Sequence, residues 1–268
     1  MRLATVNDSV FDTMITERNK IVYNLLFQIK NTEGSFIITD DCSYIFAQDS
    51  RRAPGWLFLN SAPNEKAKEE LISIITGMVK INPLFQINGN NTLVRPILDE
   101  VSARLGVSYK EVLPMSVYYC EEASPLESRG KMVRPSETHR QRLKELISTI
   151  SLDDDGTLIG ADDSEKYITS IVQSNSIYLW ENEKIVSIAK VANKSDGFGR
   201  INTIFTHPAE RDNGYTRMLV GEISASLLSE GITPLIYADS RAVLKSAAYE
   251  SIGYKKAGEI TQFSFARQ

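Results

Sequence analysis

The sequence predicts a mixed α/β protein with two domains, and three observations support this prediction. Segments with apolar residues on one helical face alternate with short apolar runs of strand length in both halves of the chain. Between the halves, residues 121–136 contain two prolines, one glycine and several charges but no apolar period, as expected of a linker. The length of 268 residues exceeds one typical domain and is compatible with two.

The first half starts with a helix, because the apolar side chains of residues 7–27 fall mostly on one face. The Arg-Arg-Ala-Pro-Gly segment 51–55 could receive an acidic substrate, but a hairpin loop anchored by Trp56 is the simpler interpretation. The predicted order begins with a helix at 7–27 and strands at 35–40, 43–47 and 56–59. Residues 63–66 then lead into a helix that includes Val79, and a short strand follows at 85–87. After the turn at 88–91 come a helix that includes Leu105 and a strand at 115–120.

The second half has a similar order of elements. Its first helix has Ser136 as the N-cap, with His139 three residues later, and Gly253 stops its last helix. Residues 181–183, Glu-Asn-Glu, form the turn of a hairpin. The predicted elements are helices at 136–150 and 164–173, strands at 176–180, 184–191 and 200–206, a helix at 214–229, a strand at 234–238, a helix at 242–251 and strands at 254–257 and 260–265.

Composition argues against several classes of protein. A net charge of −4 and a pI near 5.4 argue against a nucleic-acid partner. The sequence has neither the apolar core of a signal peptide nor an apolar run long enough to span a membrane, so we expect no membrane partner. Two distant cysteines, Cys42 and Cys120, fit a reducing cytoplasm, where we expect this protein to work.

A metal site is not expected either. The two histidines, His139 and His207, stand alone, and the cysteines have no metal-ligand spacing. Residues 153–156, Asp-Asp-Asp-Gly, place the glycine at the fourth position and not the sixth, so they do not match a calcium-binding EF-hand loop. We interpret these four residues as a solvated turn.

The strongest functional signal follows the strand predicted at 200–206. There Arg211 and Gly214 precede Thr216 in an Arg-x-x-Gly-x-small turn that opens an amphipathic helix. The first N–H groups of a helix lack partners within the helix, and its dipole makes that end positive, so such a turn suits a pyrophosphate. Gly214 removes a side chain where an anion must approach the backbone. Many glycine turns only start a helix, so the turn by itself leaves that alternative open.

Several blocks in the same order resemble the GCN5-related N-acetyltransferase (GNAT) superfamily over about residues 134–265. Residues 211–216 match the acetyl-CoA loop Arg/Gln-x-x-Gly-x-Gly/Ala, and Phe-Thr-His-Pro at 205–208 resembles the strand end before it. Downstream, residues 237–240 and the Tyr-x-x-x-Gly-Tyr block 249–254 resemble the last core strand and the end of the following helix.

The resemblance implies two tandem GNAT-like domains, each a mixed, mostly antiparallel twisted sheet flanked by helices. Residues 1–125 would be a degenerate copy, and residues 134–268 would be the acetyltransferase domain. In this fold the strand before the loop and the next strand splay apart, and acetyl-CoA enters the gap as co-substrate. The implied activity is transfer of its acetyl group by direct attack of an amine of a small molecule or peptide. The alternative is an acyl-CoA-binding protein with weak or no catalysis, and a homodimer is one assembly that either form could adopt.

The resemblance also implies roles for individual residues. Tyr249 would protonate the departing thiolate. The backbone or side chains of the following residues would hold acetyl-CoA: Ile204, Phe205, Thr206, Arg211, Asp212, Asn213, Gly214, Tyr215 and Thr216.

The sequence departs from the family pattern at three positions. Thr216 replaces the usual Gly or Ala, so it narrows the approach to phosphate or supplies a hydroxyl donor instead. Ala242 and Lys245 stand where many relatives have Asn and Ser; Lys245 could meet a phosphate or be solvated.

The general base is also open, because the strand at 200–206 has no glutamate. His207, Glu181, Glu183 and a water relay are the alternatives.

Overall fold

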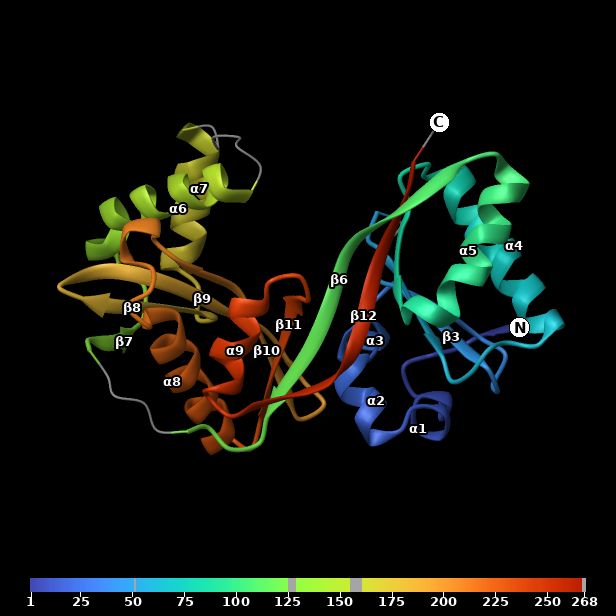
Figure 1. The fold of residues 1–268 in the computed structure, drawn as a ribbon, viewed down its shortest axis with the longest axis horizontal. Coiled ribbons are helices and arrows are strands. Elements are labelled where there is room, and N and C mark those ends of the chain that lie inside the picture. The colour runs from blue at the N-terminus through green and yellow to red at the C-terminus, as the bar shows by residue number, and fades with distance from the viewer. Residues whose placement is uncertain (51, 125–128, 155–160, 267–268) are drawn as a thin grey trace. The chain divides into compact units, whose positions relative to one another are not determined.

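The computed structural model describes residues 1–50, 52–124, 129–154 and 161–266 (Figure 1). The chain divides into two compact units that are not consecutive halves. The first unit contains Met1–Val117, Tyr237–Val243 and Lys256–Gln268, and the second contains Tyr118–Ile236 and Leu244–Lys255. The C-terminal segment therefore belongs to the N-terminal unit. The domain limits at residues 125 and 134, and the tandem arrangement of two GNAT-like domains, stay predictions.

The first unit is a mixed sheet in the order β1-β2-β3-β4-β5-β12. Strands β4 and β5 pair in parallel, and the other neighbouring strands in this series pair antiparallel. The strands are β1 (Arg2–Leu3), β2 (Phe36–Thr39), β3 (Tyr44–Gln48), β4 (Gly55–Leu59), β5 (Gln86–Gly89) and β12 (Tyr254–Ala266), and β6 (Ser108–Cys120) also begins in this unit. The helices are α1 (Val10–Met14), α2 (Glu17–Val22), α3 (Asn24–Lys30), α4 (Glu65–Ile81) and α5 (Asn91–Leu105).

The prediction of one continuous helix at 7–27 is wrong, because this segment forms α1, α2 and α3. Ile15 ends α1 in an extended conformation, and the Thr16 side chain accepts a hydrogen bond from the backbone N–H of Asn19 at the start of α2. Tyr23 leaves the helical region and separates α2 from α3. Apolar periodicity continues across both breaks, so it conceals them.

The opposite difference occurs at the C-terminus, where the two strands predicted at 254–257 and 260–265 are one strand, β12. Gly258 lies in the gap between the two predicted strands, and in the structure it is part of β12. A Cβ atom at Gly258 would lie 2.8 Å from Cγ2 of Val22. The glycine therefore permits a close approach inside a continuous strand.

Helices α4 and α5 lie side by side and cover one face of the first unit's sheet (Figure 1). Their buried residues, including Leu71 and Val101, pack with Leu57 of β4 and Ile87 of β5. Phe263 and Phe265 of β12 belong to the same core and are almost fully buried. The last strand of the chain thus supplies two large side chains to the core of the N-terminal unit.

The second unit has a sheet in the order β11-β10-β9-β8-β7. Strands β10 and β11 pair in parallel, and the rest pair antiparallel. The strands are β7 (Lys131–Val133), β8 (Ile177–Asn182), β9 (Lys184–Ser195), β10 (Phe198–Thr206) and β11 (Thr233–Asp239). The helices are α6 (Arg140–Asp154), α7 (Ala161–Val172), α8 (Tyr215–Ser229) and α9 (Val243–Glu250), with short 3-10 turns at Glu137–His139 and Pro208–Glu210.

These elements confirm the predicted mixed α/β class. Helices α6 and α7 pack against β8 and β9 through a core that includes Leu143, Ile168 and Leu179, and α8 lies on the opposite face (Figure 1). The predicted N-cap is also present, because Ser136 and His139 form a reciprocal capping box.

Strand β7 was missed inside the predicted linker, because a strand of three residues is too short to show an alternation of apolar and polar side chains. Gly130 before β7 has φ 101°, and a Cβ atom there would lie 2.3 Å from the carbonyl oxygen of Glu181.

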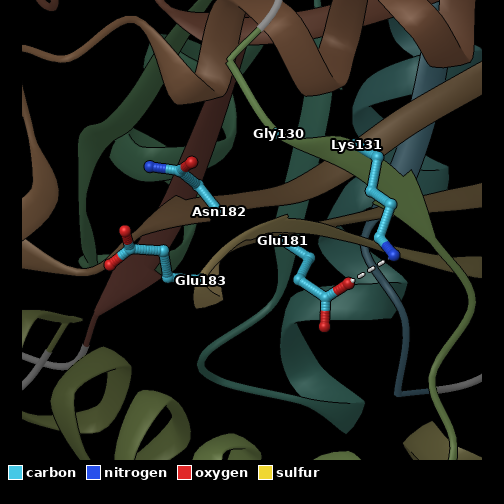
Figure 2. A pocket seen from close by; sticks show the side chains of 5 residues that line it. All are labelled: Gly130, Lys131, Glu181, Asn182 and Glu183. Carbon is cyan, nitrogen blue, oxygen red and sulfur yellow. Dashed lines mark ion pairs between the residues drawn. The ribbon is translucent and has the colours of Figure 1, made fainter.

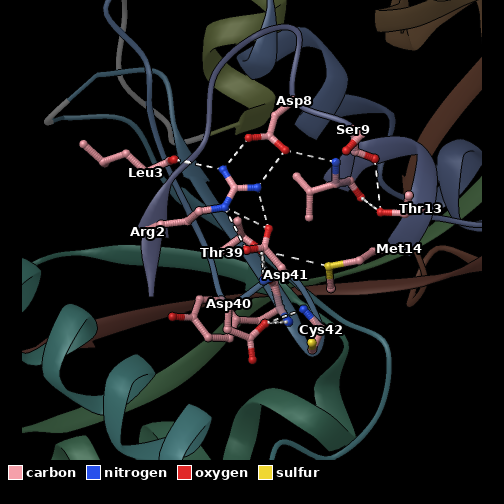
Figure 3. A network of polar contacts seen from close by, with 12 residues as sticks. Arg2, Leu3, Asp8, Ser9, Thr13, Met14, Thr39, Asp40, Asp41 and Cys42 are labelled. Atoms are coloured by element: carbon pink, nitrogen blue, oxygen red, sulfur yellow. Dashed lines mark hydrogen bonds and ion pairs between the residues drawn. The ribbon is translucent and has the colours of Figure 1, made fainter.

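A polar network ties the N-terminus to the first unit (Figure 3). Arg2 on β1 donates hydrogen bonds to Asp8, with an Nη2–Oδ1 distance of 2.9 Å, and to Asp41, with an Nε–Oδ2 distance of 2.8 Å. The hydrogen bond from the Arg2 guanidinium lowers the pKa of the Asp8 carboxyl to about 2. Ionised Asp8 is therefore more favourable in the folded chain than in the unfolded chain.

We expect this pair to make the first unit less stable in acid. A carboxyl with a lowered pKa stabilises the fold fully above its ordinary pKa near 4, and the contribution is lost as the pH falls through about 2. Wild type should exceed Asp8→Asn in unfolding free energy by roughly 1 kcal/mol at pH 5, the upper range for a partly exposed ion pair, and by clearly less at pH 2, where about half of the folded chains have Asp8 protonated. Urea unfolding at both pH values measures this difference. Glu17→Gln, which alters an exposed i,i+3 pair, should show no such pH dependence, and an equal dependence in both variants would contradict the assignment.

Candidate functional site

Strand β10 carries Ile204, Phe205 and Thr206 to the start of the glycine turn, next to an irregularity in the sheet. Its antiparallel ladder with β9 shifts register between Asn202 and Phe205, and Thr203 there has φ 50°. This is a β-bulge, a local extra residue that changes the direction of the following side chains. Of the three predicted site residues on β10, Ile204 lies in the bulge and Phe205 and Thr206 follow it.

The parallel ladder between β10 and β11 is short. It joins Phe198 to Thr233, Gly199 to Pro234 and Arg200 to Leu235, and it has no later pair in the described residues. The edge of residues 201–206 that faces β11 is thus left out of this ladder. The early end of the ladder agrees with the splayed strands that the GNAT resemblance implies.

The loop after β10 is held by its own contacts. The Arg211 guanidinium donates to the carbonyl of Thr206, with an Nε–O distance of 3.4 Å, and its carbon lies 5.7 Å from the centre of the Phe205 ring. The Asn213 side-chain amide donates to the carbonyls of Glu210 and Arg211, both at 3.2 Å. These contacts fix the chain just before helix α8.

Helix α8 begins without a side-chain cap. Gly214 is its N-cap, with φ 77°, in the left-handed region that a glycine adopts without strain. By contrast, Asn64 and Asn90 cap α4 and α5, where each side chain accepts a hydrogen bond from the third helical N–H.

The six backbone N–H groups of residues 212–217 donate no hydrogen bond to any part of the chain that the structure describes. They include Asp212 and Asn213 of the loop and Tyr215 and Thr216 of the first helical turn. Six free donors at a positive helix end make a site that fits an anion with several oxygens.

Three side chains in the first turn of α8 carry polar groups close to these N–H groups. Thr216 has its hydroxyl 2.7 Å from that of Thr206, and Tyr215 accepts a hydrogen bond from the Asn182 side chain at 2.6 Å. Arg217 has a buried Nε without a hydrogen-bond partner among the described residues. Arg217 was not singled out from the sequence, although it directly follows the last motif position.

Tyr249 lies on α9 in a buried group of aromatic rings. Only 5% of Tyr249 is exposed, and its ring centre is 6.1 Å from those of Tyr118 and Tyr254. Burial raises the pKa of the Tyr249 hydroxyl to about 12, with a smaller contribution from Tyr118. Within the described residues this hydroxyl has no hydrogen-bond partner, so its proton is available to another acceptor. Ala242 precedes α9 and Lys245 belongs to it, but the Lys245 side chain lies outside the described part.

The two glutamates considered as general bases line a pocket of about 490 Å³ (Figure 2). Glu181 is paired with Lys131, with an Nζ–Oε2 distance of 3.1 Å, and its other oxygen is 3.9 Å from Nε2 of His139. Glu183 is exposed and has φ 62° in the hairpin turn. Within the described residues neither glutamate forms a hydrogen bond or ion pair with Tyr249 or with residues 211–216, but Asn182 between them donates a hydrogen bond to Tyr215.

His207, the other candidate base, has a local structural contact. Its Nδ1 accepts a hydrogen bond from the backbone N–H of Ala209 at 3.3 Å, which caps the 3-10 turn. Nearby, Lys184 binds Glu210 at 2.7 Å and lowers the pKa of that carboxyl. The general base therefore stays open between His207, the pocket glutamates and a water relay.

Several other sequence predictions can be placed. Trp56 is buried on β4 and packs edge-on against Tyr237, as expected of an anchored hairpin, whereas Arg51 lies outside the described residues. The turn predicted at 153–156 is wrong for its first half, because Asp153 and Asp154 end helix α6; residues 155 and 156 are not described. In the ranges that the structure describes, no cluster of His, Cys, Asp or Glu could hold a metal ion, and no helix is long and apolar enough to cross a membrane.

Comparison with known proteins identifies similar chains. Residues 179–263 match the model of the FR47-like protein family. A GNAT-family acetyltransferase from Colwellia psychrerythraea has a similar structure, with a TM-score of 0.57, 12% identity and coverage of 99% of this chain and 100% of that one. A GCN5-related N-acetyltransferase from Kribbella flavida has a TM-score of 0.61, with 10% identity and coverage of 94% and 96%. A Drosophila protein has a TM-score of 0.66, with 12% identity and coverage of 99% and 98%. Among curated proteins, no match was found.

Proposed function

Because this chain has the fold of the GCN5-related N-acetyltransferases, we propose that it transfers an acetyl group from acetyl-CoA to an amine of a small molecule or peptide. The observation that carries this proposal is the run of six unpartnered N–H groups at residues 212–217, at the start of α8. They follow β10, a strand whose parallel ladder ends early, after the short segment of residues 207–211. This combination offers both an anion site and a free strand edge for one elongated ligand.

The residues present fit acetyl-CoA as the acyl donor. The N–H groups of residues 212–216, with Arg211 beside them, would hold its diphosphate through charge-assisted hydrogen bonds. The backbone of Ile204, Phe205 and Thr206 would bond the amides of its pantetheine arm on the edge that β11 leaves unpaired. In this chemistry the amine attacks the thioester carbonyl and the thiolate leaves.

Tyr249 would protonate the departing thiolate of CoA. Its hydroxyl remains protonated at neutral pH, since burial raises its pKa to about 12. It can therefore donate a proton or a hydrogen bond without first having to be protonated.

We expect CoA to stabilise the protein and acetyl-CoA to release its thiol in the presence of a suitable amine. At a hundredfold excess over its dissociation constant, CoA should raise the unfolding free energy by about 2.7 kcal/mol. A thermal shift with CoA and a thiol-release assay with a panel of amines measure the two effects. No stabilisation by CoA would contradict the proposal, because the free N–H groups would then serve no CoA site.

A matched pair of glycines tests the position of the site. Gly214 and Gly34 have φ 77° and 79°, and neither has close neighbours that an added Cβ would strike. Changing either one to Ala imposes similar backbone strain of about 1–2 kcal/mol. Gly214→Ala should also reduce the stabilisation by CoA, whereas Gly34→Ala should leave it unchanged.

The absence of a carboxylate from β10 favours a second candidate, an acyl-CoA-binding protein without turnover. Such a protein would be stabilised by CoA but would release no thiol with any amine. Removal of the Tyr249 hydroxyl would change no measurable property of such a protein, so the Tyr249→Phe variant separates the two functions.

A further inference from the structure

Three hydroxyl groups of the second unit form a chain from the sheet to helix α8. Ser187 on β9 lies opposite Thr206 in the β9–β10 ladder, and their hydroxyl groups are hydrogen-bonded. The Thr206 hydroxyl is also bonded to that of Thr216, at 2.7 Å. Ser187 is 1% exposed and Thr206 is 8% exposed, whereas Thr216, the second residue of α8, is only half-buried.

Burial fixes the direction of this hydroxyl chain. Each hydroxyl has one proton to donate, and in the described residues the Thr206 oxygen is the one acceptor that the Ser187 hydroxyl contacts. If Thr206 donated to Ser187, the Ser187 proton would be buried without an acceptor, which is unfavourable. Ser187 therefore donates to Thr206. Thr206 in turn donates to Thr216, because that is its remaining hydroxyl neighbour.

Thr216 consequently accepts a hydrogen bond and keeps its own proton free. That proton is attached to the first turn of α8, together with the N–H groups of residues 212–217, and all of these donors lack an acceptor within the described chain. Donors that converge at one positive helix end suit an oxyanion with several oxygens.

We propose that the Thr216 hydroxyl donates a hydrogen bond to the diphosphate of acetyl-CoA, and that Ser187 and Thr206 are positioning residues that orient it. The proposal rests on the proposed function, which supplies the ligand. It gives a physical reason for a threonine where the related loops have Gly or Ala: a side-chain donor, oriented from the sheet, contributes where a bare backbone would otherwise approach the phosphate. The site would thereby favour acyl donors that carry a diphosphate over simple pantetheine thioesters.

The test compares CoA with pantetheine, which has no diphosphate, by calorimetric titration of the full chain. Thr216→Val keeps the shape of the side chain but removes the donor, so we expect the dissociation constant for CoA to rise about 10- to 100-fold, as for loss of a hydrogen bond to a charged group. Affinity for pantetheine should not change. Thr216→Ser should restore CoA binding to within a few-fold of wild type, and Thr149→Val, on helix α6, is the control for the same chemical change elsewhere.

A double-mutant cycle tests the positioning role of Ser187. Ser187→Ala should weaken CoA binding several-fold, because Thr206 is then no longer held in its donating orientation, and it should add nothing in the presence of Thr216→Val. Unchanged CoA binding by Thr216→Val, equal losses for CoA and pantetheine, or independent losses in the cycle would each overturn the proposal. If wild type binds no CoA, the proposed function itself fails; if wild type binds CoA normally and Thr216→Val does too, only the hydroxyl chain fails.

Discussion

Tyr249→Phe is expected to lower kcat with acetyl-CoA about 10²- to 10⁴-fold, the usual range for loss of a placed proton donor. The change removes one hydroxyl from a buried ring that packs between Tyr118 and Tyr254. That hydroxyl has no hydrogen-bond partner in the described part of the chain, so its loss should change neither the unfolding free energy nor the affinity for CoA. Steady-state kinetics, with calorimetry for CoA binding, measure the two sides of this expectation.

Tyr254→Phe is the matched control. The Tyr254 hydroxyl is bonded to Ser224 of α8 at 2.7 Å, so this variant should lose about 1 kcal/mol of stability and retain its kcat. The pH dependence gives a further check. Because the pKa of Tyr249 is about 12, loss of its proton should produce no fall in kcat between pH 8 and 10. Equal turnover by Tyr249→Phe and wild type would remove Tyr249 from the mechanism and favour the binding protein without turnover.

Deletion of residues 261–268 is expected to unfold the first unit, although that unit begins at the other end of the chain. The deletion removes the β12 residues that pair with β5, from Thr261 opposite Gly89 to Ser264 opposite Gln86. It also removes Phe263 and Phe265 from the core under α4 and α5. Truncation of one buried Phe to Ala costs about 3–5 kcal/mol, so the two together approach the whole stability of a typical domain, about 5–15 kcal/mol.

Amide hydrogen exchange locates this effect, because α4 and α5 should lose their protection in the shortened chain. Phe263→Ala should lower the unfolding free energy by about 3–5 kcal/mol, whereas Ser264→Ala, at the next position of β12, should lower it by less than about 1 kcal/mol. Unchanged protection of α4 and α5 would show that β12 is dispensable. The same packing predicts poor solubility for a fragment that begins at Arg134, since it keeps both phenylalanines but lacks the core that buries them.

The elements that were predicted well are those whose signal is local. The helix predicted at 214–229 is α8 at Tyr215–Ser229, because a long apolar face and a glycine start are both visible in the sequence. The helix predicted at 7–27 failed because its breaks depend on the Thr16 cap and on the conformation of Tyr23, which leave the apolar period intact. The membership of β12 in the first unit could not be predicted, because its pairing with β5 joins residues far apart in the chain.

The candidate site also contains residues that a local pattern identifies and residues that only the folded structure brings together. The residues from Arg211 to Thr216 are consecutive, so a pattern could identify them, and their roles stay predictions. Ser187 had no such signal: it is one serine in an apolar strand, and only the β9–β10 register places it opposite Thr206. Asn182 likewise becomes relevant only through its contact with Tyr215.

The place of β12 in the first unit also has a consequence for synthesis. The ribosome completes residue 117 first, but the strand that closes this unit emerges roughly 140 residues later. At a synthesis rate of about 5–20 residues per second that interval is on the order of 10 s, much longer than the collapse of a small domain. During it the apolar surface of α4 and α5 stays incompletely covered, so the unfinished first unit is prone to aggregation until β12 has been synthesised.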